Sequence, residues 1–301
     1  QWLTLALDIA KRGRIVSKNK SHLLLIKLLL TASLLVQAQV HGASPIKYSK
    51  ELRFQSEGSW LPALYYGAAG PGPHPTVILL HGYPGNEKNL DIAQGLRAYG
   101  YNVMFFHYRG AWGAEGEFGF LNAEADVQAA IAFLSDSNRA RDLNVNIDRL
   151  SLVGHSMGGH MALAGLQQNE TIRCAVAYDT ANIGVTFSAA DADRAASWVA
   201  YGDSLFMLRG WSGEKSKREV ESNQAQLDLR NYVTAIGSRP VLLIAADSDV
   251  IPLTRIEELA DAMRKANVPV TYQLLADDHS FNNHRDELLA STHDFLDREC
   301  Q

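Results

Sequence analysis

The sequence predicts an α/β fold: a mostly parallel β-sheet flanked by helices, with an N-terminal antiparallel hairpin and a helical insertion after the sixth strand. Short runs that are apolar throughout alternate with longer stretches of helical periodicity, which is typical of a parallel sheet covered on both faces. A segment of alternating apolar and polar residues precedes them, and one interval between strands is unusually long. The chain has 301 residues, of which 47% are hydrophobic, enough for one sizeable core.

Residues 1–38 form a basic leader with six Lys or Arg residues and one Asp, although the whole chain carries a net charge of −5. Within it, residues 18–38 have the features of a secretory signal peptide. Two lysines precede an apolar stretch at 23–36, and a small-residue cleavage site ends at Ala38. That stretch is shorter than the roughly 20 residues that span a bilayer and contains Lys27, which disfavours a membrane anchor. We expect an exported protein, periplasmic or secreted, with no stable membrane anchor after cleavage.

Residues 39–301 are predicted to form a single domain. Alternating apolar and polar residues over 51–66, around Gly58, predict two antiparallel strands. The Gly- and Pro-rich residues 70–75 end this hairpin. Buried strands are then predicted at residues 76–80, 101–106, 149–153, 173–178, 241–245 and 270–275. Helices are predicted near residues 88–98, 122–137, 157–168, 254–266 and 281–298.

The two cysteines are predicted to be unpaired. Cys174 lies in the apolar run 173–178 and is interpreted as a small core residue, whereas Cys300 is next to last and is expected to be exposed. Export would permit a disulfide, but a domain of this size does not need one for its stability.

The interval of 56 residues from 184 to 239 separates two consecutive strands, where a crossover normally needs about a dozen residues. It contains Trp198, Phe206 and Trp211, and its run 205–208 is too apolar to lie exposed. We interpret the insertion as a helical lid over the active site, with these three aromatic residues as candidate substrate contacts. The alternative is a passive flap that only packs on the body.

The motif Gly154-His155-Ser156-Met157-Gly158 has the G-x-S-x-G pattern of a nucleophile elbow. It follows an apolar strand and opens a helical stretch, as this mechanism requires. Gly154 and Gly158 are needed because the turn leaves no room for side chains, and the turn lifts the hydroxyl of Ser156 clear of the backbone. The pattern predicts Ser156 as the nucleophile, and His155 is interpreted as a packing residue.

A serine nucleophile needs a histidine base and an acid that orients it, here in the chain order Ser, Asp or Glu, His. His279 is the expected base, because it lies between the last strand and the last helix, while the two later histidines fall inside that helix. Two aspartates follow the strand at 241–245. Asp249 is preferred as the acid from the spacing of its turn, and Asp247, nearer the strand, is the alternative.

Acyl transfer also needs donors for the oxyanion. One predicted donor is the backbone N–H of Met157, at the N-terminus of a helix. The other is the backbone N–H of Tyr83, in the loop after the first parallel strand, where Gly82 allows the chain to turn toward the site. This chemistry requires neither a metal ion nor an organic cofactor.

These motifs together resemble the α/β-hydrolase superfamily over about residues 50–298. The resemblance rests on the His-Gly loop at 81–82, the elbow at 154–159, Asp249 and His279. It implies an α/β-hydrolase fold and serine hydrolase activity. The pairing of Tyr83 with the residue after the nucleophile is also similar to that in cutinase-like polyester hydrolases.

A second segment resembles the branch that includes serine aminopeptidases and acyl-peptidases. It runs from His107 to Gly116 and contains Arg109, in the position of an arginine-glycine loop that lies near the active site in that branch. The resemblance makes Arg109 a candidate substrate contact, and the alternative is that it only braces loops. The chain has no counterpart of the propeller domain of the large peptidases, which counts against peptidase activity.

The predicted function is therefore hydrolysis of a small carboxylic ester through an acyl-enzyme. The alternatives are an exported aminopeptidase or acyl-peptidase acting on short peptides, a cofactor-free non-hydrolytic relative, and an inactive binding module. Serine at the elbow excludes a dehalogenase, which would need aspartate there. The net charge of −5 argues against a nucleic-acid partner, and the sequence does not indicate an oligomeric state.

Overall fold

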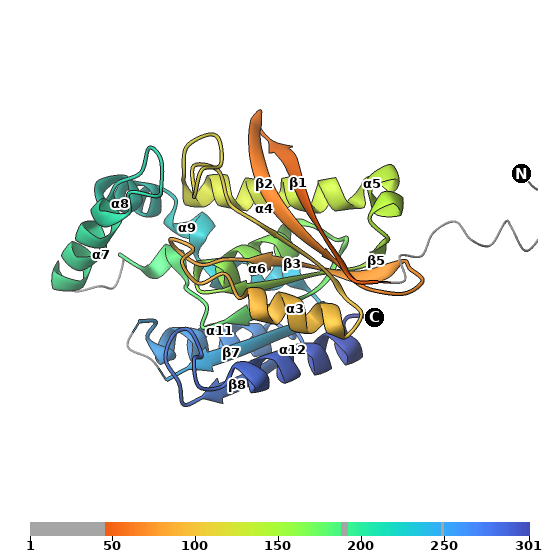
Figure 1. Cartoon of the computed structure of the whole chain (residues 1–301). Helices are drawn as coiled ribbons and strands as arrows, with labels where there is room; N and C mark the ends of the chain where they lie inside the picture. The colour runs from red at the N-terminus through yellow and green to blue at the C-terminus, as the bar shows by residue number, and fades with distance from the viewer. Residues whose placement is uncertain (1–45, 188–191, 248–249) are drawn as a thin grey trace, which may run out of the picture. The chain divides into compact units, whose positions relative to one another are not determined.

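The computed structural model describes residues 46–187, 192–247 and 250–301, and Ser44–Gln301 form one compact unit. The predicted leader at 1–38 lies outside the described residues. Within them, a sheet of eight strands has the order β1-β2-β4-β3-β5-β6-β7-β8. Figure 1 shows helices on both sides of this sheet. The hairpin β1–β2 is antiparallel and joins β4 antiparallel, while all other neighbours are parallel. The predicted mostly parallel sheet with an N-terminal hairpin is confirmed.

The strands are β1 (Tyr48–Ser56), β2 (Ser59–Gly67), β3 (His74–Leu80), β4 (Asn102–Phe106), β5 (Val145–His155), β6 (Ile172–Tyr178), β7 (Val241–Ala246) and β8 (Val270–Leu275). The helices that flank them are α3 (Leu90–Ala98), α4 (Phe120–Ser135), α5 (Ser137–Asp142), α6 (Met157–Gln168), α11 (Leu253–Lys265) and α12 (Arg285–Glu299). Each predicted strand and helix has its counterpart, with shifts of a few residues at the ends.

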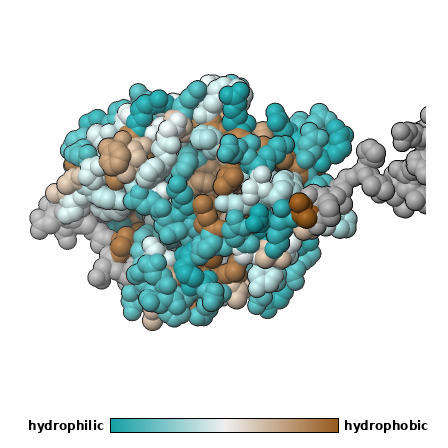
Figure 2. Space-filling view, viewed as in Figure 1, coloured by the Kyte–Doolittle hydropathy of each residue, from teal (hydrophilic) through white to brown (hydrophobic). Residues whose placement is uncertain are grey.

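The central strands are apolar throughout because both faces of the sheet are covered. In β3, Val77 and Leu79 pack with side chains of α3 and α12. Ile78 and Leu80 pack on the opposite face with side chains of α4, α6 and α11. All four are at most 1% exposed. The face of the molecule in Figure 2 is mostly hydrophilic, with apolar residues in small separate groups. In the described part of the chain, no helix is long and apolar enough to cross a membrane.

Cys174 and Cys300 form a disulfide, so the prediction that they are unpaired was wrong. Cys174 lies in β6 and Cys300 directly follows α12, and their Cα atoms are 5.6 Å apart. Cys300 is only 3% exposed. Helix α12 packs on the face of the sheet that carries Val77 and Leu79, and this brings Cys300 back to β6, 126 residues from Cys174 in the sequence. Local sequence carries no sign of such a long-range approach.

The insertion between β6 and β7 is helical, as predicted. It contains η1 (Ile183–Val185), α7 (Ala192–Ser204), α8 (Gly213–Ser222), α9 (Gln224–Leu227), η2 (Leu229–Asn231) and α10 (Val233–Ile236). Helices α7 and α8 lie side by side at one end of the sheet (Figure 1). Their approach requires Gly213, because a Cβ there would collide with the carbonyl oxygen of Val199. The backbone N–H of Gly213 also donates to Asp203, at 2.8 Å.

Candidate active site

Ser156 lies at the tip of a tight turn between β5 and α6. Its backbone has φ 58° and ψ −117°, a conformation that a residue with a side chain rarely adopts and that costs energy. Its backbone N–H donates to Tyr178 O, at 2.8 Å, which ties the turn to β6. A Cβ at Gly154 would collide with the carbonyl of Gly158, and one at Gly158 with the carbonyl of Leu80. The turn therefore needs glycine at both positions that the motif marks.

His279 lies between β8 and α12, and its Nδ1 is 2.5 Å from Oδ2 of Asp179. Asp179 directly follows β6, its side chain is fully buried, and its Oδ1 accepts a hydrogen bond from Ala246 N at 3.1 Å. Asp249 lies outside the described residues. Asp247 is exposed, and its backbone N–H donates to Leu275 O at 3.1 Å. Asp179, which follows β6, therefore occupies the position beside Nδ1 of His279 that was predicted for Asp249, which follows β7.

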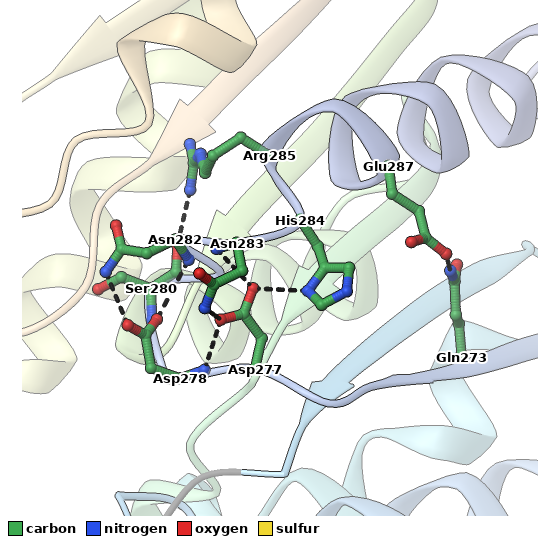
Figure 3. Close-up of polar contacts among 9 residues, drawn as sticks. All are labelled: Gln273, Asp277, Asp278, Ser280, Asn282, Asn283, His284, Arg285 and Glu287. Carbon is green, nitrogen blue, oxygen red and sulfur yellow. Dashed lines mark hydrogen bonds and ion pairs between the residues drawn. The ribbon is translucent and has the colours of Figure 1, made fainter.

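The chain around His279 is held by two aspartates that accept several hydrogen bonds each (Figure 3). Asp277 accepts from the backbone N–H of Asp278, from the backbone and side chain of Asn283, and from Nδ1 of His284, all at 2.8–2.9 Å. Asp278 accepts from the backbone N–H groups of Ser280 and Asn282 and from the Asn282 amide. These bonds fix the loop on both sides of His279, and the contact with Asp179 orients its ring.

Burial alone would raise the pKa of Asp277. The hydrogen bonds from His284, Asn283 and the backbone outweigh that effect, because they stabilise the carboxylate, and they hold the pKa at about 2. Asp277 is therefore ionised at neutral pH, and its negative charge helps to hold the conformation of the loop that carries His279.

Ser156 and His279 line one cavity of about 490 Å³. Helices α7 and α8 supply part of its wall, through Trp198 and Tyr201 and through Ser216 and Val220, respectively. The remaining lining residues are Tyr83, Phe120, Met157, Ala181, Ile183, Thr186, Phe187, Ser197, Val250 and Ile251. None of the described lining residues is Asp, Glu, Lys or Arg. In the described ranges, no His, Cys, Asp or Glu side chains are grouped so that three could hold a metal ion.

Residues 77–292 match the family model described as the alpha/beta hydrolase family. The chain belongs to the alpha/beta hydrolase family. No curated protein matches it. Among solved structures, it resembles the acylaminoacyl peptidase of Pyrococcus horikoshii with a TM-score of 0.66 and 16% identity, over 89% of this chain and 44% of that one. The hydrolase thus spans less than half the length of that peptidase.

Two solved esterases match over most of their own length. The Pyrococcus furiosus esterase Pf2001 has a TM-score of 0.63 and 18% identity, with 84% of this hydrolase and 94% of that chain covered. Est1E from Butyrivibrio proteoclasticus has a TM-score of 0.63 and 16% identity, with 83% and 98% covered. At these identities the structures show a common fold, and the family assignment supports hydrolase activity.

The predicted oxyanion donors of this hydrolase lie at the cavity. Met157 is the first residue of α6, where backbone N–H groups have no acceptor within the helix. The loop before Tyr83 approaches the nucleophile closely, because a Cβ on Gly82 would lie 3.0 Å from the Cβ of Ser156. Tyr83 and Met157 both line the cavity together with Ser156.

His155 does more than the packing that the sequence suggested. Its Nε2 lies 2.6 Å from the carbonyl oxygen of His279, and because a carbonyl only accepts, Nε2 carries the proton. The ring is buried, and burial, assisted by the nearby His279, lowers the pKa of His155 to about 3. A neutral histidine beside the nucleophile therefore ties the elbow to the backbone of the expected base.

The aromatic residues of the insertion occupy three different positions. Trp198 lines the cavity. Trp211 does not line it, but its indole N–H donates to the hydroxyl of Tyr83 at 2.7 Å. Phe206 is 90% exposed, so the prediction that it covers the body was wrong. In its run, Leu205 and Leu208 are buried and anchor the segment, while the turn between them directs Phe206 outward.

Arg109 braces loops and does not line the cavity. It is 6% exposed, and its guanidinium contacts Oδ1 of Asp126 and Oε2 of Glu57, each at 2.6 Å. Its backbone N–H also donates to Asp126, at 2.7 Å. These contacts use the charge of Arg109 to hold the segment before α4, so its candidate role as a substrate contact is not realised.

Proposed function

We propose that the chain is a serine hydrolase that cleaves carboxylic esters through an acyl-enzyme, with Ser156, His279 and Asp179 as its triad. The contact between His279 and the buried Asp179, beside a cavity that also contains Ser156, carries the proposal. The three residues follow the chain order Ser, Asp, His that this fold uses. Asp179 takes the role that the sequence analysis gave to Asp249.

In the first half-reaction, Nε2 of His279 takes the proton of Ser156 Oγ as this oxygen forms a bond to the ester carbonyl carbon. Asp179 accepts the Nδ1 proton of His279 in a hydrogen bond and stabilises the imidazolium. The backbone N–H groups of Met157 and Tyr83 stabilise the oxyanion. The ester C–O bond then breaks, and the leaving alcohol receives the proton from His279. Water repeats these steps on the acyl-enzyme, releases the acid and restores Ser156.

The cavity favours an ester with an uncharged, mainly apolar acyl group. An aminopeptidase would need a carboxylate to bind the ammonium group of its substrate, and the described lining contains none. The described lining instead presents aromatic and aliphatic side chains, including Phe120 and Trp198, and its volume of about 490 Å³ is in the range of small-molecule sites. The second candidate is cleavage of short peptides with a blocked amino terminus, which the fold shared with an acylaminoacyl peptidase favours.

A substrate panel separates the two candidates. We expect turnover of p-nitrophenyl esters of short and medium acyl chains and no turnover of free aminoacyl-p-nitroanilides. N-acetylated aminoacyl-p-nitroanilides test the second candidate. Ser156→Ala is the control, and it should lower ester turnover by several orders of magnitude while the melting temperature stays close to that of the wild type. Faster cleavage of the anilides than of the esters would contradict the proposal.

We also propose that the protein is exported, with cleavage of the leader after Ala38. The signal-like leader at 18–38 supports this, and the buried disulfide between Cys174 and Cys300 fits an oxidising compartment. Mass spectrometry of the amino-terminal peptide of the protein recovered outside the cytoplasm tests the proposal. A start at Gln39 is expected, and an uncleaved chain retained in the cytoplasm would contradict it.

A further inference from the structure

We propose that Trp211 and the side chain of Tyr83 are positioning residues, and that the hydrogen bond between them lets the insertion hold the oxyanion donor in place. This inference rests on the proposed ester hydrolysis and gives the insertion a role in it beyond that of a cavity wall. It concerns contacts outside the triad.

Tyr83 has two functions in one residue. Its backbone N–H is the predicted oxyanion donor, and its ring extends into a cluster of aromatic side chains. The ring centroids of Phe118, Phe120, Trp198 and Tyr201 lie 5.7–6.1 Å from that of Tyr83. Because the N–H and the ring belong to the same residue, a ring that is held in place limits how far the N–H can move relative to Ser156.

The hydroxyl of Tyr83 is held by a hydrogen bond from the insertion. The indole N–H of Trp211 donates to it at 2.7 Å. Gly202 of α7 lies near the same oxygen, because a Cβ on it would be 3.4 Å away. Burial raises the pKa of Tyr83 well above its usual value, which keeps the hydroxyl neutral as an acceptor.

Trp211 is itself anchored to the body of the molecule. Its ring packs edge-on against Phe118 and Phe120, with centroid distances of 4.9 and 5.2 Å. Two residues earlier, Arg209 N donates to Gly110 O at 2.7 Å, and Arg209 O accepts from Phe118 N at 3.0 Å. The indole is therefore held in place, and its hydrogen bond to Tyr83 restrains the loop that carries the oxyanion donor.

The Trp211–Tyr83 contact predicts a defined kinetic signature. Loss of a complete oxyanion donor costs roughly 10²–10³ in kcat, so displacement of a donor that remains present should cost less, roughly tenfold. The ring that faces the cavity is unchanged in Tyr83→Phe, so KM should stay within about twofold. Trp211→Phe removes the same hydrogen bond from the other side and should have the same effect.

A double-mutant cycle on a p-nitrophenyl ester tests the inference. Tyr83→Phe, Trp211→Phe and the double variant are compared with the wild type, with Trp60→Phe in β2 as a control for loss of an indole away from the cavity. We expect each single change to lower kcat roughly tenfold, and the double variant to lose no more than either single one. Binding of phenylboronic acid, which forms a tetrahedral adduct with a serine oxygen, should weaken by the same factor as kcat.

Unchanged kcat and boronate binding in both single variants would overturn the inference, as would losses that multiply in the double variant. An effect on KM alone would mean that the pair only shapes the cavity, and this result would also overturn the inference. Two conservative variants reach the same bond from opposite sides, so one that fails to fold still leaves the other as a test. A wild-type protein that cleaves no ester and is not labelled at Ser156 by a fluorophosphonate would instead contradict the proposed function, and this inference with it.

Discussion

Replacing Asp179 with asparagine should nearly abolish turnover while leaving the fold intact. The carboxylate lies 2.5 Å from Nδ1 of His279 and is fully buried, so no water can replace it. An asparagine oxygen can still accept from Ala246 N, as Asp179 Oδ1 does now. The amide NH₂ group would then face Nδ1 of His279. Nδ1 would become an acceptor, and the proton would move to Nε2, the nitrogen that must take the proton of Ser156.

The expected cost follows from losing both the anion and the correct tautomer. Such a change lowers kcat by roughly 10⁴ in serine hydrolases, which corresponds to about 5.4 kcal/mol of transition-state stabilisation. The assay is the initial rate on a p-nitrophenyl ester at saturating substrate, with melting temperatures measured in parallel. Asp249→Asn is the matched control and should cost far less. A variant Asp179→Asn that keeps a tenth of wild-type activity, with Asp249→Asn losing about 10⁴, would refute the assignment.

Three further outcomes are expected. Trp198→Ala should enlarge the cavity and shift kcat/KM toward bulkier acyl groups by about 1–3 kcal/mol, whereas Phe206→Ala, at a 90% exposed position, should leave the ratios unchanged; equal shifts in both would count against the assigned cavity wall. The pKa of Asp277 is held at about 2, below the usual value of roughly 3.9. Its charge therefore stabilises the fold fully at pH values above this usual value, and this stabilisation is lost as the pH falls toward 2. The difference in melting temperature between the wild type and Asp277→Asn should therefore shrink between pH 6 and pH 2.5, and a constant difference would contradict the role of its charge. Replacing both Cys174 and Cys300 with alanine should lower the free energy of unfolding by about 2–4 kcal/mol, measured by urea titration, and unchanged stability would argue against the disulfide in the folded protein.

The fold could be predicted because its central strands have a local signature. Residues 77–80 of β3 are apolar at every position since both faces of the sheet are covered, and this pattern does not depend on which strands are neighbours. The elbow was equally accessible. A Cβ at Gly154 would collide with backbone a few residues away, and one at Gly158 with backbone of the adjacent strand. The G-x-S-x-G motif therefore identifies both positions directly.

The carboxylate beside His279 could not be chosen from local sequence. Strands β6 and β7 are neighbours in the sheet, and both end at the same edge, so an aspartate after either one comes near the site. Asp179 directly follows the apolar run of β6, a signal present in the sequence but shared with Asp247 after β7. The choice depends on where His279 lies, which is set by the hydrogen bonds of Asp277 and Asp278.

Two other differences have similar tertiary causes. The disulfide depends on the path of α12 across the sheet, and spacing along the chain carries no trace of it. Phe206 belongs to an apolar run, but burial of Leu205 and Leu208 is sufficient to anchor that run. Hydrophobicity alone therefore predicted burial of more residues in the run than are buried in the structure.

Mass spectrometry of the intact protein after reaction with a fluorophosphonate tests the central claim most directly. The account predicts a single adduct, mapped by peptide sequencing to Ser156, and its absence in Ser156→Ala together with loss of ester turnover. Asp179→Asn should form the adduct far more slowly than the wild type. An adduct at another residue, or a Ser156→Ala variant that still hydrolyses esters, would contradict it.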